Sequence, residues 1–486
     1  PGGIVMSNKN NNAYLIYAGE NYRFENYIEI GINNLKLYYN NCTVIKKNMG
    51  DKTLILMGRV VDSNHPHSEP DSIAESLIKS SNIDELIENS KGLAGRFIIL
   101  YSNGKQLYIL PDAVASIPVT FTTHGELSVA SNPRFVAEMK GWHESDVSRE
   151  IKNKAAPTHP LPYDLTMYDQ MRKVPPNHYF DFRARKAIRF YPIKKEKPVG
   201  VEEASEISSK LLKNVVIGYH NRYRLSLPLT SGVDSRTILA LCRDFISEIP
   251  TYTFFHDHFT DKTADIAIPR AMAEKFGFEH FTLRHIDLPP NIMKECKVEL
   301  GSLVNPLELQ NAWTYYNHSL KNFIRLDGNI SPLGKSSFGR DLPELLATTA
   351  YLVTKTHNYS KKNKQEVARW HEDIRHFAKQ SDISKYDLFF WEHRVGNWTS
   401  NSYLNADLFT NSLNVFNSRA IIETWLRVPR KYRKDSEIHQ AIIRKNWPEL
   451  LDFPFNPDAK YEILYKNPLI YYFAVRGKYI IERHKY

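Results

Sequence analysis

Residues 227–236 read LPLTSGVDSR, a short apolar run that enters a turn of small residues and ends in an acid and a hydroxyl. Further along, Ile238, Leu241, Cys242 and Phe245 repeat at the i, i+3, i+4 and i+7 spacing of an amphipathic helix. The stretch therefore predicts a strand, a tight loop and a helix in direct succession.

The composition of this loop favours a phosphate ligand. Its small residues allow backbone N–H groups to crowd around phosphate oxygens, and the following helix directs its positive N-terminus at the same place. Asp234 would then hold Mg²⁺ against the phosphates. The alternative is an ordinary strand-to-helix turn, of which such folds contain many. The predicted nucleotide-binding residues are Leu229, Thr230, Ser231, Gly232, Val233, Asp234 and Ser235, with Phe254 and Lys335 from later segments.

The segments around the loop alternate between helical and strand patterns. Helical spacing precedes it at 204–215, while 251–255 and 281–283 have strand composition. Between those strands, 265–276 has a helical pattern closed by Gly277. Repeated strand–helix units predict an α/β fold with a doubly wound parallel sheet, whose ligands bind at the carboxyl ends of the strands.

The loop resembles the SGGxDS motif of the ATP pyrophosphatase (PP-loop) superfamily. Thr230 stands for the first Ser and Ser231 for the first Gly, while Gly232, Asp234 and Ser235 match. Members of that superfamily cleave ATP between the α and β phosphates and leave AMP on the substrate. The resemblance implies ATP and Mg²⁺ as cofactors.

Composition places the chain among globular proteins. It has 486 residues, of which 42% are hydrophobic, and no apolar run approaches the length of a membrane span. Residues 1–7 lack the layout of a signal peptide, and 1–5 are expected to precede a native Met6. The cysteines lie far apart and suit a reducing compartment, so a cytoplasmic location is expected. They are Cys42, Cys242 and Cys296.

The basic charge balance has several explanations. The net charge is +10, with 64 Lys and Arg interleaved with 54 Asp and Glu along the whole chain. The densest basic cluster, 183–197, is expected to be a solvated face rather than a phosphate track. ATP, an anionic substrate or an acidic peptide would explain the charge equally well, so nucleic acid is not an expected partner.

The pattern changes along the chain. The first 145 residues are rich in short β-type runs, with one helix expected at 72–87, and the segment 154–200 is a proline-rich connector that carries one hairpin. Beyond 342 the pattern becomes mainly helical. The expected strands of the first part are 13–17, 52–61, 96–101, 106–110, 117–121 and 126–130.

Five further pieces extend the resemblance. They are GLAGRF at 92–97, LYILPD at 107–112, IPV at 117–119, VAS at 129–131 and MRKVPPNH at 171–178. In this order and spacing they resemble the glutaminase domain and linker of class B asparagine synthetases. The resemblance implies an Ntn-type α+β domain over 1–150, a linker with a hairpin over 151–200, and a PP-loop synthetase domain with a helical C-terminal region over 201–486.

A glutaminase of that family needs an N-terminal cysteine as nucleophile, and this chain has none. Ser7 would follow a removed Met6, but the first strand begins only at Ala13, which places Ser7 too far upstream. The N-terminal domain is therefore expected to be inactive. This points to the amide-forming branch that uses an amine already present on a substrate, as in β-lactam synthetases and lasso-peptide cyclases.

A second departure lies at 323–334, FIRLDGNISPLG. The family has a strand here that ends in GxGxDE, whose Asp is a Mg²⁺ ligand, but the matching position is Pro332. Asp327 at the strand end is the candidate substitute, and a turn-capping Asp is the alternative. The segment with Lys335 also approaches a Walker loop, but it is one residue too long and Pro332 removes a backbone donor.

The C-terminal region offers a candidate catalytic group. QAIIR at 440–444 resembles the family's KxxLR helix, after which a lysine follows by roughly sixteen residues. Lys460 stands at that place. The resemblance implies that its ammonium stabilises negative charge during amide formation, whereas chance placement of a common residue is the alternative.

Together these features predict an ATP-dependent ligase that adenylates a carboxylate and couples it to an amine without glutamine. The expected substrate is a carboxylate-bearing small molecule, glycan or peptide, and a homodimer or a partner biosynthetic protein is the expected assembly. A non-catalytic binding or assembly subunit and a tRNA-modifying PP-loop enzyme are the alternatives.

Overall fold

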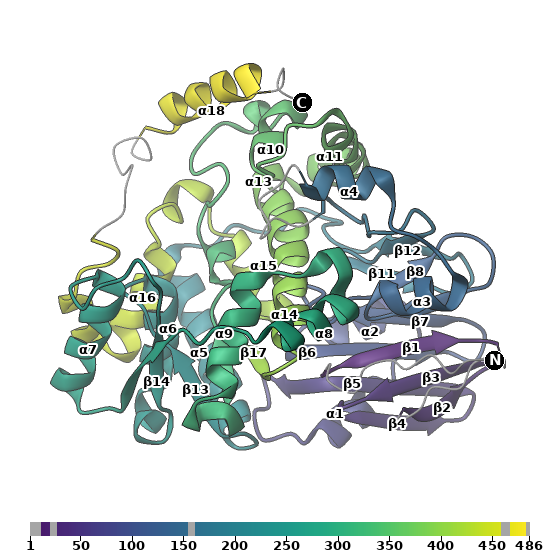
Figure 1. Cartoon of the computed structure of the whole chain (residues 1–486), viewed down its shortest axis with the longest axis horizontal. Coiled ribbons are helices and arrows are strands. Elements are labelled where there is room, and N and C mark those ends of the chain that lie inside the picture. The colour runs from purple at the N-terminus through teal and green to yellow at the C-terminus, as the bar shows by residue number, and fades with distance from the viewer. Residues whose placement is uncertain (1–10, 20–26, 154–160, 458–466, 483–486) are drawn as a thin grey trace.

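The computed structural model describes residues 11–19, 27–153, 161–457 and 467–482. Two antiparallel sheets form the N-terminal part, and a parallel sheet with its helices forms the rest (Figure 1). No helix among these residues has the length and apolar character needed to cross a membrane.

The N-terminal part is a sandwich of two six-stranded sheets. In spatial order, the first contains β10 (Met171–Lys173), β8 (Thr120–Thr122), β9 (Ser128–Ala130), β1 (Ala13–Tyr17), β3 (Leu35–Asn40) and β2 (Ile28–Ile32). The second contains β12 (Lys186–Arg189), β11 (His178–Asp181), β7 (Leu107–Pro111), β6 (Leu93–Ser102), β5 (Lys52–Asp62) and β4 (Val44–Met49).

Alternation along the strands builds four layers. Ile16 and Leu37 of the first sheet meet Met57 and Ile98 of the second in one buried cluster. The opposite faces are covered by helices, which are α3 (Pro133–Lys140) and α4 (Asp146–Asn153) on the first sheet and α1 (Pro70–Leu77) and α2 (Ile83–Asn89) on the second. The order of layers is helix, sheet, sheet, helix.

The single helix expected at 72–87 is wrong, because the chain breaks into α1 and α2. Asn82 adopts an extended conformation and its side chain accepts the backbone N–H of Glu85, which starts a new helix. The strands expected in this half are confirmed with shifted ends. The sequence prediction missed β2, β3 and β4, and exposed residues interrupt the buried pattern of β2 and β4.

The parallel sheet has the order β15-β14-β13-β16-β17. Its strands are β13 (Leu225–Pro228), β14 (Thr251–Phe255), β15 (His280–Arg284), β16 (Ile324–Asp327) and β17 (Ser412–Asn414). The chain proceeds outward from β13 through β14 to β15, and then returns to the other side of β13 with β16 and β17. The strand order therefore reverses between β13 and β16.

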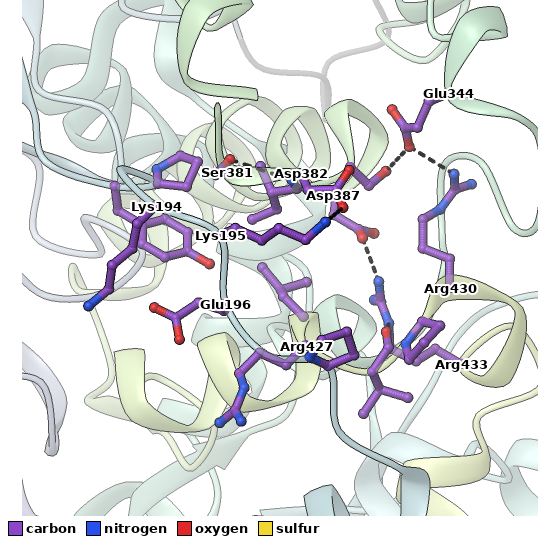
Figure 2. Close-up of a pocket in the computed structure, with 18 of the residues that line it drawn as sticks. Lys194, Lys195, Glu196, Glu344, Ser381, Asp382, Asp387, Arg427, Arg430 and Arg433 are labelled. Carbon is purple, nitrogen blue, oxygen red and sulfur yellow. Dashed lines mark hydrogen bonds and ion pairs between the residues drawn. The ribbon is translucent and has the colours of Figure 1, made fainter. Parts of the chain in front are cut away.

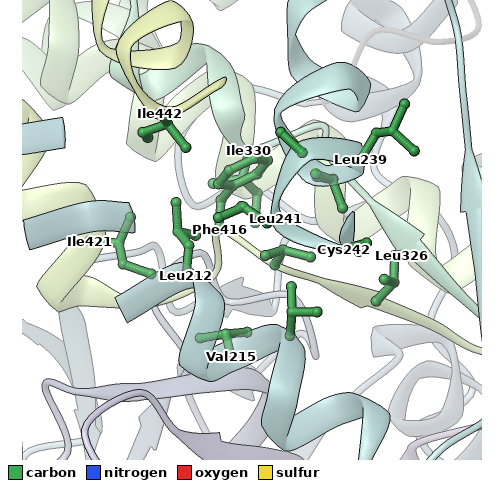
Figure 3. Packing of buried hydrophobic residues seen from close by; sticks show 14 of the residues in the cluster. Leu212, Val215, Leu239, Leu241, Cys242, Leu326, Ile330, Phe416, Ile421 and Ile442 are labelled. Carbon is green, nitrogen blue, oxygen red and sulfur yellow. The ribbon is translucent and has the colours of Figure 1, made fainter. Parts of the chain in front are cut away.

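Helices cover both faces of this sheet. One face packs against α5 (Val201–His220), α6 (Val233–Leu241), α15 (Arg419–Leu426) and α16 (Glu437–Asn446) in the cluster shown in Figure 3. On the other face, α9 (Pro306–Tyr316) places Tyr315 against Tyr252 and Leu283. The predicted α/β class with a parallel sheet is confirmed at this level.

The remaining α-helices are α7 (Ala264–Phe276), α8 (Pro290–Leu300), α10 (Thr349–Thr354), α11 (Lys361–Asp373), α12 (Arg375–Ser381), α13 (Lys385–Phe389), α14 (Ser400–Ala406) and α18 (Pro468–Glu482). A π-helix follows α13 at Phe390–Thr399. Short 3₁₀ turns connect several of them, and the two that matter for the site are η4 (Ser331–Gly334) and η8 (Pro448–Asp452). The helical region expected beyond 342 is confirmed.

A buried ion pair joins the part with the two antiparallel sheets (the two-sheet half) to the part with the parallel sheet (the parallel-sheet half). The Arg96 guanidinium of β6 donates to both carboxylate oxygens of Asp407, which follows α14, at 2.8 and 2.7 Å. Next to it, the Asn417 side chain donates to the Gly95 carbonyl and to Asp112. Because these buried hydrogen bonds cross from one half to the other, the halves meet in a fixed arrangement.

Candidate functional site

The loop at 229–232 lies where the parallel sheet reverses its strand order. It leaves the carboxyl end of β13 and leads into α6, which begins at Val233. Gly328, which follows β16, lies against the backbone of Asp234. A Cβ placed on Gly328 would lie 3.8 Å from the carbonyl carbon of Asp234. In open parallel sheets, ligands bind in the crevice at such a switch point. The structure therefore places the loop at the position that the sequence predicts.

Three consecutive backbone N–H groups of the loop point at oxygen atoms. Thr230 N donates to Ser235 Oγ at 3.1 Å, and Ser231 N donates to Asp265 Oδ1 at 2.9 Å. Gly232 N donates to Thr230 Oγ1 at 3.2 Å. The loop thus presents converging donors, and side-chain oxygens of the chain itself accept from them.

Asp234, in the first turn of α6, is held by a cation and a hydroxyl. Lys335 Nζ lies 2.5 Å from its Oδ1, and Ser331 Oγ donates to the same oxygen at 2.6 Å. Burial favours the neutral acid, but Lys335 and Ser331 more than offset burial, so the pKa of Asp234 is lowered. Asp234 is therefore a carboxylate at neutral pH.

His439 of α16 completes this cluster, because its Nε2 lies 2.7 Å from Ser331 Oγ. Burial, reinforced by the Lys335 charge, lowers the pKa of His439 to about 3, so the ring is neutral. Ser331 uses its one proton toward Asp234, so His439 must donate from Nε2. Its Nδ1 is buried, and none of the residues that the structure describes forms a hydrogen bond with it.

A cavity of about 190 Å³ opens at the carboxyl ends of β13, β14 and β16. Pro228, Phe254 and Asp327 line it from the three strand ends, and Glu308 faces them from α9. The other lining residues are Asn311, Arg325, Gly328, Asn329, Ser402, Tyr403 and Ala406. The structure thus brings the predicted residues Phe254 and Asp327 to one cavity.

Asp327 is paired with a cation of its own strand. Arg325 lies 3.6 Å from Asp327 Oδ1, and both side chains are nearly buried. Burial raises the pKa of Asp327 against the opposing effect of Arg325. Arg325 also donates to the Tyr252 hydroxyl at 2.9 Å. Asp327 thus has a cation of the chain nearby, while burial still favours its neutral form.

Two of the predicted loop residues serve the core. The side chains of Leu229 and Val233 are buried in the cluster beneath the sheet. The Leu229 N–H donates to the Tyr252 carbonyl, and its own carbonyl accepts from Thr253 Oγ1. Leu229 therefore has no free backbone donor for a ligand in this conformation.

Arg236 ties the loop to the chain that follows α16. Its guanidinium donates to four carbonyl oxygens, those of Ser231, Leu450, Phe453 and Pro454. The backbone N–H of Asn456 donates to the Ser231 carbonyl at 3.4 Å. The segment that leads toward Lys460 therefore crosses the loop. Lys460 itself, with the rest of 458–466, lies outside the described residues.

A metal site built from protein side chains alone does not fit these residues. No three His, Cys, Asp or Glu side chains in the described ranges gather in a way that could hold a metal ion. The two predicted ligands, Asp234 and Asp327, each face a cation of the chain instead. Pro332 is the second residue of η4 and offers no ligand atom at the position that resembles the family's acid.

A second cavity of about 330 Å³ lies between the segment after β12 and the end of α15 (Figure 2). Lys195 pairs with Asp382 at 2.7 Å, and Arg433 with the buried Asp387 at 2.5 Å. The charges that line it are largely paired. The basic cluster at 183–197 is not one solvated face, since Arg189 is buried against Glu392.

Four residues of the site escaped the sequence analysis: Ser331, His439, Asp265 and Arg236. Ser331 stands 97 positions from Asp234 and 108 from His439, so no local pattern connects them. The only available signal was for Asp265, an acid at the start of a predicted helix beside the loop.

The chain matches no protein family model and none of the curated proteins. Among solved structures it is similar to glutamine phosphoribosylpyrophosphate amidotransferase from B. subtilis complexed with ADP and GMP, with 11% identity over 57% of this chain and 85% of that one. It is also similar to the allosteric regulatory enzyme of purine biosynthesis, with 9% identity over 57% and 76% of the two chains. Both TM-scores are 0.25, too low to transfer any property of these enzymes.

Proposed function

We propose that this chain is an ATP-dependent ligase that activates a substrate carboxylate as its adenylate, releases pyrophosphate, and couples the acyl group to an amine with release of AMP. The observation that carries the proposal is the position of the loop. Converging N–H donors, the N-terminus of α6 and the Lys335 ammonium all lie at the reversal of strand order.

The residues divide the work in the proposed reaction. Thr230, Ser231 and Gly232 bind phosphate oxygens, which replace the side-chain acceptors that now engage their N–H groups. Lys335 binds charge on the phosphates, and Asp234 positions Lys335. Phe254 and the cavity beside it hold the nucleoside or the acyl substrate. The resemblance to asparagine synthetases assigns Lys460 the stabilisation of charge during amide formation, and no glutamine is used.

Exchange of labelled pyrophosphate into ATP tests the proposal. In the presence of a correct carboxylate, label should enter ATP, because adenylation is reversible. A panel that covers amino acids, uronic acids and peptides addresses the substrate classes that the sequence leaves open. Exchange with none of them, together with ATP binding, would favour the second candidate below.

The second candidate is a non-catalytic subunit that binds a nucleotide or a partner protein. It is favoured by one observation, namely that both acids expected to hold a metal ion are already paired with Lys335 and Arg325. Such a subunit would bind ATP without turnover under any substrate condition.

A further inference from the structure

The groups around Asp234 are hydrogen-bond donors, whereas Mg²⁺ requires oxygen atoms that accept or coordinate. Lys335 has only protons to offer, and the single proton of the Ser331 hydroxyl goes to Asp234. One lone pair of that hydroxyl accepts the Nε2 proton of His439. Each group in the cluster thus delivers a proton toward the carboxylate.

The fixed direction of these protons removes ligands from a metal ion. Protonation of His439 would add positive charge to the cluster but no coordinating atom. At neutral pH the ring stays neutral, because the pKa of His439 is about 3. With its proton on Asp234 and one lone pair on His439, the Ser331 hydroxyl keeps one lone pair for any further partner. A hard cation could reach Oδ1 of Asp234 only by displacing Lys335 and Ser331, which both bind that oxygen.

The same donors are well suited to an anion. A primary ammonium held 2.5 Å from a carboxylate keeps two further protons, and the Lys335 side chain is 20% exposed, so it is accessible from solvent. It extends from the loop after η4 toward the first turn of α6, where the helix dipole also favours negative charge. A polyphosphate at the loop would meet this ammonium directly.

We infer that Lys335 takes the place of a protein-bound divalent cation, so that the loop at 229–235 binds the polyphosphate of a nucleotide through an ammonium and binding does not depend on a metal ion. This inference rests on the proposed nucleotide site. Asp234 acts in it as the anchor of Lys335, which makes it a positioning residue rather than a metal ligand.

Calorimetric titration of the full chain with ATP, once with Mg²⁺ and once with EDTA, tests this directly. The dissociation constants in the two conditions should agree within about threefold, because the protein supplies the counter-charge itself. In EDTA, Lys335→Met should weaken binding by about tenfold or more, the scale of a lost charged hydrogen bond. Lys335→Arg, which keeps the charge, should retain most of the affinity.

Lys445→Met is the matched control, since Lys445 of α16 also forms one ion pair, with Glu206 at 3.0 Å, but is exposed and outside the site. It should bind ATP as the wild type does. Wild-type binding that is lost in EDTA and restored by Mg²⁺ would overturn the inference and leave the proposed nucleotide site standing. Absence of binding in both conditions would overturn the proposed function as well. The wild-type comparison decides even if Lys335→Met does not fold.

Discussion

The two-sheet half and the parallel-sheet half use their polar residues in opposite ways. In the former, all ten residues of β6 are buried, and polar side chains such as Asp112 bond to neighbouring backbone and to the other half. In the latter, Arg325 and Asp327 line a cavity at the carboxyl ends of the strands, and Asp234 binds Lys335 in the first turn of α6. The difference shows where chemistry can occur, because an antiparallel sandwich closes its strand ends with turns, whereas a parallel sheet aligns its carboxyl ends.

The strongest way to break this comparison is to separate the halves. Arg96→Met would leave Asp407 charged and buried at the interface, and breaking a buried pair costs about 3–5 kcal/mol of unfolding free energy. Urea denaturation should show this loss. Arg375→Met removes the exposed pair with Glu372 and should change little. Equal stability of both variants would mean that the buried pair does not hold the halves together.

Asp234→Asn tests the parallel-sheet edge alone. The amide keeps the shape but no longer holds Lys335 by charge, so pyrophosphate exchange should fall by about 10²-fold or more while the fold survives. Asp244→Asn, at an exposed ion pair with Lys213, serves as the control. Pyrophosphate exchange at the wild-type rate in Asp234→Asn would mean that the loop takes no part in the reaction.

Lys173 tests the boundary between the halves, since it lines a small cavity together with Thr120 of β8 and Asn401 of α14. Burial, partly opposed by Asp164, lowers its pKa to about 7. Between that value and the pKa of an unfolded lysine, near 10.4, the unfolded chain binds the extra proton. The unfolding free energy should therefore rise with pH across this window.

Lys173→Met should remove this slope, of at most about 1.4 kcal/mol per pH unit, and should stabilise the protein more at pH 7 than at pH 10. Chemical denaturation at several pH values measures the difference, with the exposed Lys186→Met as control. A slope that is the same in wild type and variant would show that Lys173 is protonated in the folded state.

The smallest expected effect concerns the two-sheet half. Purified protein should not release glutamate from glutamine above the buffer rate, with or without ATP, because no cysteine directly precedes the first strand, β1. Ser7 lies outside the described residues. Glutamate release that disappears in Ser7→Ala would show that the two-sheet half has glutaminase activity, and the contrast between the halves would then fail.

Local patterns predicted the parts of the fold that local forces decide. The strand at 251–255 appears at its expected place because it consists of β-branched and aromatic residues. The helix that ends at Phe276 does so because Gly277 caps it. β2 to β4 were missed although they lie in local hairpins, β2 with β3 and β4 with β5, because exposed residues interrupt the strand pattern of β2 and β4. The loop at 229–235 was predictable as a contiguous motif, but the partners of Asp234 come from segments about a hundred positions away.

The four hydrogen bonds that Arg236 donates to carbonyl oxygens mean that the loop cannot be moved to another protein by itself. Burial lowers the pKa of Arg236 to about 10, and its partners at Leu450, Phe453 and Pro454 stand more than 200 positions downstream. If 227–236 were grafted into another parallel sheet, or if the chain were truncated before 450, the Arg236 guanidinium would lose three of its four acceptors. Engineering of this loop must therefore treat the ten residues and the distant turn as one transferable unit.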